Sequence, residues 1–273
     1  AYATANKSEL NVGALYRSQW VGIEGAPKTA SLFIHYPVSD RVEVGISFTN
    51  DDIGNVVTEN NIYADFAYVL PVSETAKLSL GLKAGLTLFD ANCNGFNLQS
   101  GGRDTDIAFN ENVTQSFPNV GLGAFYFTDK FYIGLSAPNV LTTTHLENEN
   151  GIQSTGVQNI HFFLNSGYVF DVGPNLRFKP SFLVKGVKGA PLTADINANF
   201  LINDTLEVGI GHRLEDSVMA LINFKVTPEL RLGYAYDYTT SNLGNFNSGS
   251  HEIILLYNVK TKFWNNGYDR SPR

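Results

Sequence analysis

Short oxygen-bearing side chains occur in the stretch DANCNG, residues 90–95, with the spacing of a calcium-binding loop. Asp90, Asn92 and Asn94 stand at alternate positions, where the oxygens of such a loop converge on a hard cation. Gly101 stands where the loop needs its bidentate glutamate, so a later aspartate would have to supply that ligand. We therefore interpret the stretch as ordinary polar loop residues and expect no cofactor, with a calcium site at Asp90, Asn92 and Asn94 as the alternative.

The other side chains that carry chemistry are scattered. The five histidines show no metal-ligand spacing, and neither a G-x-S-x-G motif nor a P-loop lysine motif occurs. The single cysteine, Cys93, excludes an intramolecular disulfide and a metal site with several cysteines. A barrel hydrolase would carry polar residues on one rim, and the candidates are Asp51, Asp52, His212, Glu215 and Asp216. Nothing in the sequence brings them together, so we expect no enzymatic activity.

The elements that must position any site are β-strands. In KLSLGLKAGLTLF, residues 77–89, leucine or alanine alternates with serine, glycine, lysine or threonine. A strand with this period has one apolar and one polar face. In a soluble sandwich the leucines would point into a core and Lys83 into water. In a membrane barrel the leucines would face lipid and Lys83 the lumen.

Similar segments recur along the chain without a convincing amphipathic helix. We predict about fourteen strands, at residues 9–17, 28–36, 41–49, 60–70, 77–89, 117–127, 131–137, 157–170, 175–187, 192–203, 206–213, 217–226, 229–238 and 250–259. The formal net charge of −7 and the lack of a basic run exclude nucleic acid as an expected partner. Since no run reaches the roughly 18 apolar residues of a transmembrane helix, only a closed barrel could span a membrane.

The connections between these strands are of two kinds. Tight turns rich in Pro, Gly, Asn, Asp and Ser follow every second strand, at residues 37–40, 71–74, 128–130, 171–175, 203–205 and 227–229. Long loops lie near residues 18–27, 50–59, 90–116, 138–156 and 239–249. Short turns on one rim and long loops on the other are typical of outer-membrane barrels. We therefore predict an all-β chain that forms one transmembrane antiparallel β-barrel domain over residues 1–273, with periplasmic turns, extracellular loops and both termini in the periplasm.

The alternation also assigns residues to the two faces of the barrel. The predicted lumen carries Arg17, Glu43, Asp65, Lys83, Arg177, Lys179, Lys185, Asp195, Glu207, Arg231 and Asp237. Both signs of charge occur, which favours internal salt bridges over a strongly ion-selective pore. Aromatic residues near strand ends are expected to form the interfacial girdles, namely Phe33, Tyr36, Phe48, Tyr68, Phe89, Phe131, Phe170 and Tyr238.

Several segments resemble, in order along the chain, the PorP/SprF family of type IX secretion outer-membrane proteins. They are AYA (1–3), LNVGALYRSQWVGIEGAPKT (10–29), FPNVGLGAFYF (117–127), YIGLSAPNVL (132–141), LRLGYAYDYT (230–239) and GSHEIILLYNV (249–259). The resemblance implies an integral barrel of the bacterial outer membrane without established enzymatic activity. Members of the family belong to the core secretion machinery or pair with one secreted adhesin, whose C-terminal domain the barrel is thought to receive.

The function that we expect is binding of such an adhesin domain, or of another secretion component, in support of its secretion or surface anchoring. The candidate partner-binding residues lie in and beside the first loop: Arg17, Gln19, Trp20, Gly25, Ala26, Pro27 and Lys28. This segment combines an aromatic residue and an arginine, which commonly anchor protein interfaces. A rim segment that only braces the barrel is the structural alternative. A passive pore or small-ligand transporter and a soluble β-sandwich are the alternative functional and fold interpretations.

Overall fold

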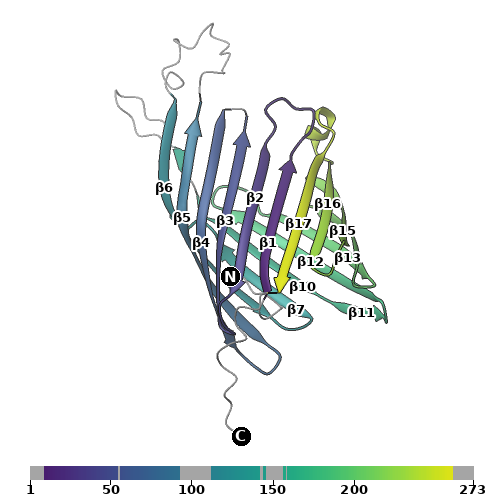
Figure 1. Cartoon of the computed structure of the whole chain (residues 1–273). Helices are drawn as coiled ribbons and strands as arrows, with labels where there is room; N and C mark the ends of the chain where they lie inside the picture. Colours follow the sequence, from purple (N-terminus) through teal and green to yellow (C-terminus); the bar gives the residue numbers. More distant parts are fainter. Residues whose placement is uncertain are drawn as a thin grey trace.

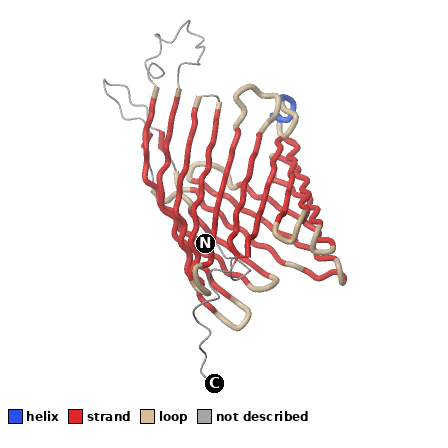
Figure 2. Tube along the Cα trace, in the orientation of Figure 1, coloured by secondary structure: helices blue, strands red, loops and turns tan. Residues whose placement is uncertain are grey.

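The computed structural model describes residues 9–54, 56–92, 112–141, 144–145, 156–157 and 159–260. Almost all of its regular structure is β-strand, as Figure 2 shows. The elements are β1 (Glu9–Ser18), β2 (Lys28–Pro37), β3 (Val42–Ile53), β4 (Val57–Pro71), β5 (Lys77–Ala91), β6 (Val113–Phe127), β7 (Phe131–Ala137), β8 (Thr144–His145), β9 (Gly156–Val157), β10 (His161–Tyr168), β11 (Phe170–Gly173), β12 (Leu176–Val187), β13 (Thr193–Ile202), β14 (Leu206–Arg213), β15 (Ser217–Lys225), β16 (Leu230–Thr239), the 3₁₀ helix η4 (Asn242–Phe246) and β17 (Ser250–Lys260). No described helix is long and apolar enough to cross a membrane.

The sheet closes on itself in two places where distant parts of the chain pair. The first and last strands, β1 and β17, pair antiparallel from Glu9 opposite Lys260 to Ser18 opposite His251. On the far side β10 pairs with both β7 and β12. Within the described residues, fourteen strands thus form a closed antiparallel barrel, and the short β11 extends one rim beside β12 (Figure 1). The prediction of an antiparallel barrel of about fourteen strands is confirmed.

The barrel wall is apolar on its outside and polar on its inside. Large hydrophobic side chains point outward from every long strand, and Ile46 and Leu82, for example, remain 62% and 47% exposed. The fully buried positions are polar instead: Ser79 is 0% exposed, and Thr87 and Asn119 are each 2% exposed. A soluble protein would have the reverse arrangement, so the outer face is a surface suited to lipid.

The two rims differ as the connections predict. One rim, called the turn rim here, carries the start of β1, the end of β17 and the tight turns between β2 and β3, β4 and β5, β6 and β7, β11 and β12, β13 and β14, and β15 and β16. The opposite rim, called the loop rim, carries the remaining connections, including residues 19–27 and the segment 240–249 that contains η4 (Figure 1). Both ends of the described chain therefore lie at the turn rim.

One segment predicted to be a loop belongs instead to the hairpin formed by β3 and β4. The stretch 50–59 was expected to be a long connection, but β3 and β4 stay in register up to Ile53 opposite Val57, which leaves only residues 54–56 between them. Polar side chains hold this extension together, since the Asn50 amide donates a hydrogen bond of 2.9 Å to Asn60. The polar composition that suggested a loop belongs to a hairpin whose backbone is fully paired.

Two of the aromatic residues assigned to the interfacial girdles point into the barrel. Phe33 shares the inner face of β2 with Ser31 and His35, and its ring stacks on His35 with a centroid distance of 5.1 Å. The ring lies over Gly13 of β1, where a Cβ atom would be 2.1 Å from it. Phe89 likewise shares the inner parity of β5 with Lys83. Phe89 lies close to the end of β5, as predicted, whereas Phe33 lies near the middle of β2, and in both strands the parity of the position decides the face.

Candidate functional site

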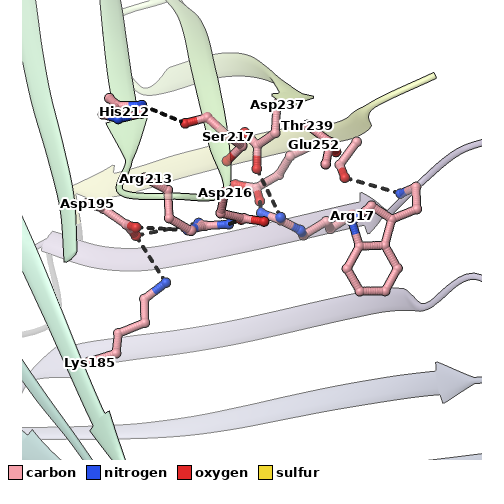
Figure 3. A network of polar contacts seen from close by, with 12 residues as sticks. Arg17, Lys185, Asp195, His212, Arg213, Asp216, Ser217, Asp237, Thr239 and Glu252 are labelled. Atoms are coloured by element: carbon pink, nitrogen blue, oxygen red, sulfur yellow. Dashed lines mark hydrogen bonds and ion pairs between the residues drawn. The ribbon is translucent and has the colours of Figure 1, made fainter. Parts of the chain in front are cut away.

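Two neighbouring sets of linked charges lie inside the barrel close to the loop rim. Together we call them the loop-rim network, which consists of Arg17, Lys185, Asp195, Arg213, Asp216, Asp237 and Glu252. These residues stand at the loop-rim ends of β12, β13, β14, β16, β17 and β1 and in the turn after β14 (Figure 3). Three cationic and four anionic side chains therefore meet on one side of the lumen.

Asp195 is the centre of one half of this network. Its side chain is 7% exposed, and its carboxylate oxygens lie 2.8 Å from Arg213 Nε and 3.0 Å from Lys185 Nζ. Arg213 also reaches Asp216 with an Nη1–Oδ2 distance of 3.2 Å. The arginine thereby bridges the inner wall and the β14–β15 turn (Figure 3).

Arg17 is the centre of the other half. Its guanidinium donates hydrogen bonds to Asp237 at 3.0 Å and to Glu252 at 3.2 Å. These carboxylates lie on β16 and β17, on either side of the connection 240–249. Arg17 ends β1 just before the loop 19–27, so its ion pairs fix the bases of two loops at once.

A second set of charges crosses the same wall nearer to the turn rim. Glu207 accepts a hydrogen bond from Lys179 Nζ at 2.8 Å and one from the Asn199 amide at 2.8 Å. Arg231 lies 3.9 Å from the same carboxylate. The inward charges of β12, β14 and β16 are therefore paired both near the loop rim and nearer to the turn rim. Such pairs are typical of structural ion pairs, whereas an ion-selective pore would carry a ring of unpaired charges.

At the turn rim itself, Arg177 joins an exposed carboxylate of β11 and one of the β13–β14 turn. It lies 2.9 Å from Asp204 and 3.8 Å from Asp171. Lys130, in the β6–β7 turn, donates a hydrogen bond of 2.7 Å to Asp171, and this bond raises the pKa of the lysine above its usual value. Because all four groups are well exposed, these pairs contribute little to stability.

The opposite wall carries an uncharged polar cluster that the sequence analysis did not identify. Tyr63 of β4 is 5% exposed, and its hydroxyl lies 3.1 Å from Asn61, 3.3 Å from Thr87 and 3.5 Å from Asn139. Asn139 follows β7, and its neighbour Val140 donates a backbone hydrogen bond of 2.8 Å to Val120 of β6. The carbonyl oxygen of Pro138 lies over the inward position Gly121, where a Cβ atom would be 2.4 Å from it, so the chain folds across the inner face of β6 after β7 ends. The signal in the sequence was an aromatic residue at an inward position between Asn61 and Asp65.

The first loop, residues 19–27, is tied to both neighbouring connections by its backbone. Val21 donates to Gly249 at 2.9 Å and accepts from Ser248 at 2.7 Å, while Gly54 donates to Gly25 at 2.9 Å. The turn needs unusual backbone conformations, with φ values of 104° and 74° at Gly22 and Gly25 and of 42° at Trp20. A non-glycine residue rarely adopts such a φ, so the surrounding hydrogen bonds hold Trp20 there.

The candidate partner-binding residues are not equally accessible on this loop. Lys28 is exposed, whereas Gln19, Trp20, Gly25 and Pro27 are half-buried. Arg17 points to its two carboxylates, which is the bracing role given as the alternative for this segment. Exposed side chains that were not singled out, Val21 and Glu24, lie at the tip of the loop.

The structure does not assemble a cation site from the residues of the candidate calcium loop that it describes. Asp90 accepts a hydrogen bond of 2.8 Å from Thr114, and the Asn92 backbone donates to Val56 at 2.8 Å. Asn94 lies outside the described residues. Among the residues that are described, no three His, Cys, Asp or Glu side chains are grouped closely enough to hold a metal ion.

The candidate hydrolase residues have separate contacts. Asp51 accepts a hydrogen bond of 2.5 Å from Thr29, His212 Nδ1 lies 3.1 Å from the Ser217 carbonyl, and Asp216 pairs with Arg213. Glu215 sits in the β14–β15 turn with a φ of 61°, and Asp52 lies opposite Lys28 in the β2–β3 ladder. None of these contacts joins one of the five candidates to another.

Comparison with known proteins gives the fold and the family. The solved structures of the Acinetobacter baumannii outer membrane protein Omp33 and of the TodX deltaS2S3 mutant, a monoaromatic hydrocarbon channel, resemble the barrel. The first is 11% identical with a TM-score of 0.51 and covers 94% of this chain and 100% of its own. The second is 9% identical with a TM-score of 0.53 and covers 94% of this chain and 91% of its own. At such identities the likeness shows the architecture alone.

No curated protein matches the sequence. The family model described as "Type IX secretion system membrane protein PorP/SprF" matches residues 1–257, nearly the whole chain. The ordered sequence blocks, the closed barrel with its apolar outer face and this match agree with one another. The chain therefore belongs to the PorP/SprF family of type IX secretion system membrane proteins and is an integral β-barrel of the outer membrane.

Proposed function

We propose that the loop rim of this barrel binds a protein partner of type IX secretion, the C-terminal domain of a secreted adhesin or another secretion component, and supports its secretion or surface anchoring. The loop rim would then face the extracellular side and the turn rim the periplasm, as in outer-membrane barrels generally. The observation that carries the proposal is an exposed surface of apolar and charged side chains on two loops. Hydrogen bonds and ion pairs at the bases of these loops hold them in place.

The exposed surface is formed by two loops that touch through their backbones. Phe246 of η4 is 73% exposed, and Val21 at the tip of the first loop is also exposed. The hydrogen bonds of Val21 with Ser248 and Gly249 keep these two apolar side chains on neighbouring segments. Glu24 and Lys28 add exposed charges of both signs to the same surface. An aromatic anchor beside a polar rim is the usual composition of a protein-binding surface.

The loop-rim network supports the same interpretation because it orders these loops before a partner arrives. Arg17 at the base of the first loop bonds to Asp237 and Glu252, which stand at the two ends of the segment that contains η4. Loops that are already ordered lose less conformational entropy on binding. An internal brace and an external binding surface are therefore compatible roles for one segment.

A direct test compares partner recovery by variants on the two rims. In the full-length protein, Phe246→Ser combined with Lys28→Glu is expected to lower recovery of its partner from outer-membrane extracts at least tenfold, because an aromatic anchor and one charge are lost together. The matched control is Val172→Ser, which changes a similarly exposed apolar residue of β11 at the turn rim. Mass spectrometry should identify the recovered protein as a secreted C-terminal domain or a type IX component. Equal recovery by the double variant and the control would contradict the proposal.

A passive pore is the second candidate, favoured by the polar inner surface of the closed wall. Single-channel recordings in planar bilayers discriminate between the two functions. For a binding scaffold with paired internal charges and a chain segment folded across β6, we expect no large, steady openings. Openings of constant high conductance would favour the pore instead.

A further inference from the structure

Four neighbouring strands carry a row of polar side chains on the outer wall, next to the loop rim. The strands are β2, β1, β17 and β16, which lie side by side in this order (Figure 1). Their ladders pair Lys28 with Ser18, Ser18 with His251, and His251 with Tyr236. These positions point outward, because Arg17, the neighbour of Ser18 in the chain, points into the lumen. The polar row therefore lies on the face that contacts lipid, at the loop-rim end of the apolar band.

The next outward row toward the turn rim is apolar and aromatic. The same ladders place side by side Ala30, Tyr16, Ile253 and Tyr234. Tyr16 and Ile253 are 48% and 51% exposed. Polar groups above an apolar bed repeat the order of a membrane lipid, whose head group stands above its acyl chains. The fold itself thus makes lipid the neighbour of both rows.

The donor groups of the polar row are not used up by contacts inside the protein. Within the residues that the structure describes, the exposed Lys28 forms no ion pair and the Ser18 hydroxyl forms no hydrogen bond. His251 Nδ1 lies 2.6 Å from the Tyr234 hydroxyl, and its ring lies 5.1 Å from that of Tyr236. With the Tyr234 hydroxyl as donor, the proton of the neutral imidazole stands on Nε2. An ammonium, a hydroxyl and an imidazole N–H thus stand in one row about 10 Å long, which is two strand spacings.

One carboxylate limits where an anion can lie on this row. Asp52 of β3 is paired with Lys28, on the side of the lysine away from Ser18. The two side chains form no ion pair with each other in the described structure, so Asp52 does not occupy the ammonium. Since a carboxylate repels an anion, the favourable position lies over Ser18, between Lys28 and His251.

We propose that this row binds the phosphate of an anionic membrane lipid. The phosphate would lie over the Ser18 hydroxyl, within reach of Lys28 and His251, and the acyl chains would lie on Tyr16 and Ile253. A lysine at a membrane surface favours anionic over uncharged lipid by about fivefold. The site faces lipid and does not depend on the proposed function. Lys28 stands where the two surfaces meet, whereas Ser18 and His251 belong to this row alone.

The test measures lipid retention by the full-length protein in detergent micelles, using native mass spectrometry. The probes are phosphatidylglycerol and phosphatidylcholine with identical acyl chains, added in equal amounts. We expect the wild-type protein to retain phosphatidylglycerol about fivefold over phosphatidylcholine. Lys28→Gln and His251→Phe should each lower this ratio to less than about twofold. The matched control is Lys188→Gln, which removes an exposed lysine between β12 and β13 and should leave the ratio unchanged.

Asp52→Asn gives a result of opposite sign, because removal of the repelling carboxylate should raise the ratio above that of the wild type. Heat-dependent migration in gel electrophoresis shows that each variant is folded, and if His251→Phe is not folded, Asp52→Asn and Lys28→Gln decide. Glycerol phosphate, which has the phosphate without acyl chains, should not displace the lipid at equal concentration.

The proposal is overturned if the wild-type protein retains both lipids alike, if the variants of the row give the ratio of Lys188→Gln, or if glycerol phosphate displaces the lipid. The last result would mean a site for free phosphate. Since the experiment contains no protein partner, its failure leaves the proposed function untouched, and a failure to recover a partner leaves the lipid ratio untouched.

Discussion

Replacement of Asp195 by alanine is expected to lower the free energy of unfolding of the barrel by about 3 kcal/mol, the lower end of the range for breaking a buried ion pair. The aspartate is the shared partner of Arg213 and Lys185, and its side chain is 7% exposed. Its loss leaves two cationic groups close together on the inner wall without the carboxylate that neutralises them. Urea unfolding from lipid vesicles, followed by tryptophan fluorescence, measures the change.

A matched replacement on the turn rim isolates the effect of burial. Asp204 pairs with Arg177 at 2.9 Å, but both side chains are well exposed. Asp204→Ala should therefore change the free energy of unfolding by less than about 1 kcal/mol. If both variants lose the same stability, burial does not decide the strength of these pairs. If Asp195→Ala loses none, the loop-rim network does not brace the barrel.

Much of the fold could be predicted from the sequence because a membrane barrel repeats one simple rule. The side chains along each strand face lipid and the lumen in turn, and every second connection between strands can be short. The alternation in residues 77–89 and the tight turns were therefore enough to predict the closed antiparallel barrel that the structure confirms. The ordered sequence blocks likewise predicted the family that the match over residues 1–257 establishes.

The parts that could not be predicted depend on contacts between distant residues. Arg17 meets Asp237 and Glu252 only because β1 closes against β17, more than 200 positions away in the sequence. A cavity of about 310 Å³ beside Phe33 likewise depends on the register of β3 to β7, which places the small residues Ala67, Gly81, Gly123 and Ser136 in one row. Local composition was also misleading at residues 50–59, where polar side chains extend a hairpin beyond the apolar band.

Replacement of Leu82 by arginine is expected to cost about 2–4 kcal/mol of folding free energy, because it places a charge on the lipid-facing side near mid-height of the wall. Leu82 is 47% exposed and lies in one outward row with Phe66 and Leu122. Its neighbour Lys83 already carries a charge but points inward, where Tyr63 and Asp65 accommodate it. Unfolding from vesicles gives the size of the loss.

The adjacent position is the control, since one step along a strand exchanges lipid for lumen. Lys83→Arg keeps an inward charge beside Tyr63 and should lose less than about 1 kcal/mol, the size of a partly hydrated cation–π contact. Cysteine at Leu82 or Leu86, in a Cys93→Ser background, should react with a lipid-soluble maleimide, whereas cysteine at Lys83 should not. Equal labelling of the two parities, or equal losses from Leu82→Arg and Lys83→Arg, would mean that the leucines of β5 do not face lipid. Labelling at the two leucine positions alone, together with a larger loss from Leu82→Arg, places the charge of Lys83 inside the barrel, over the ring of Tyr63.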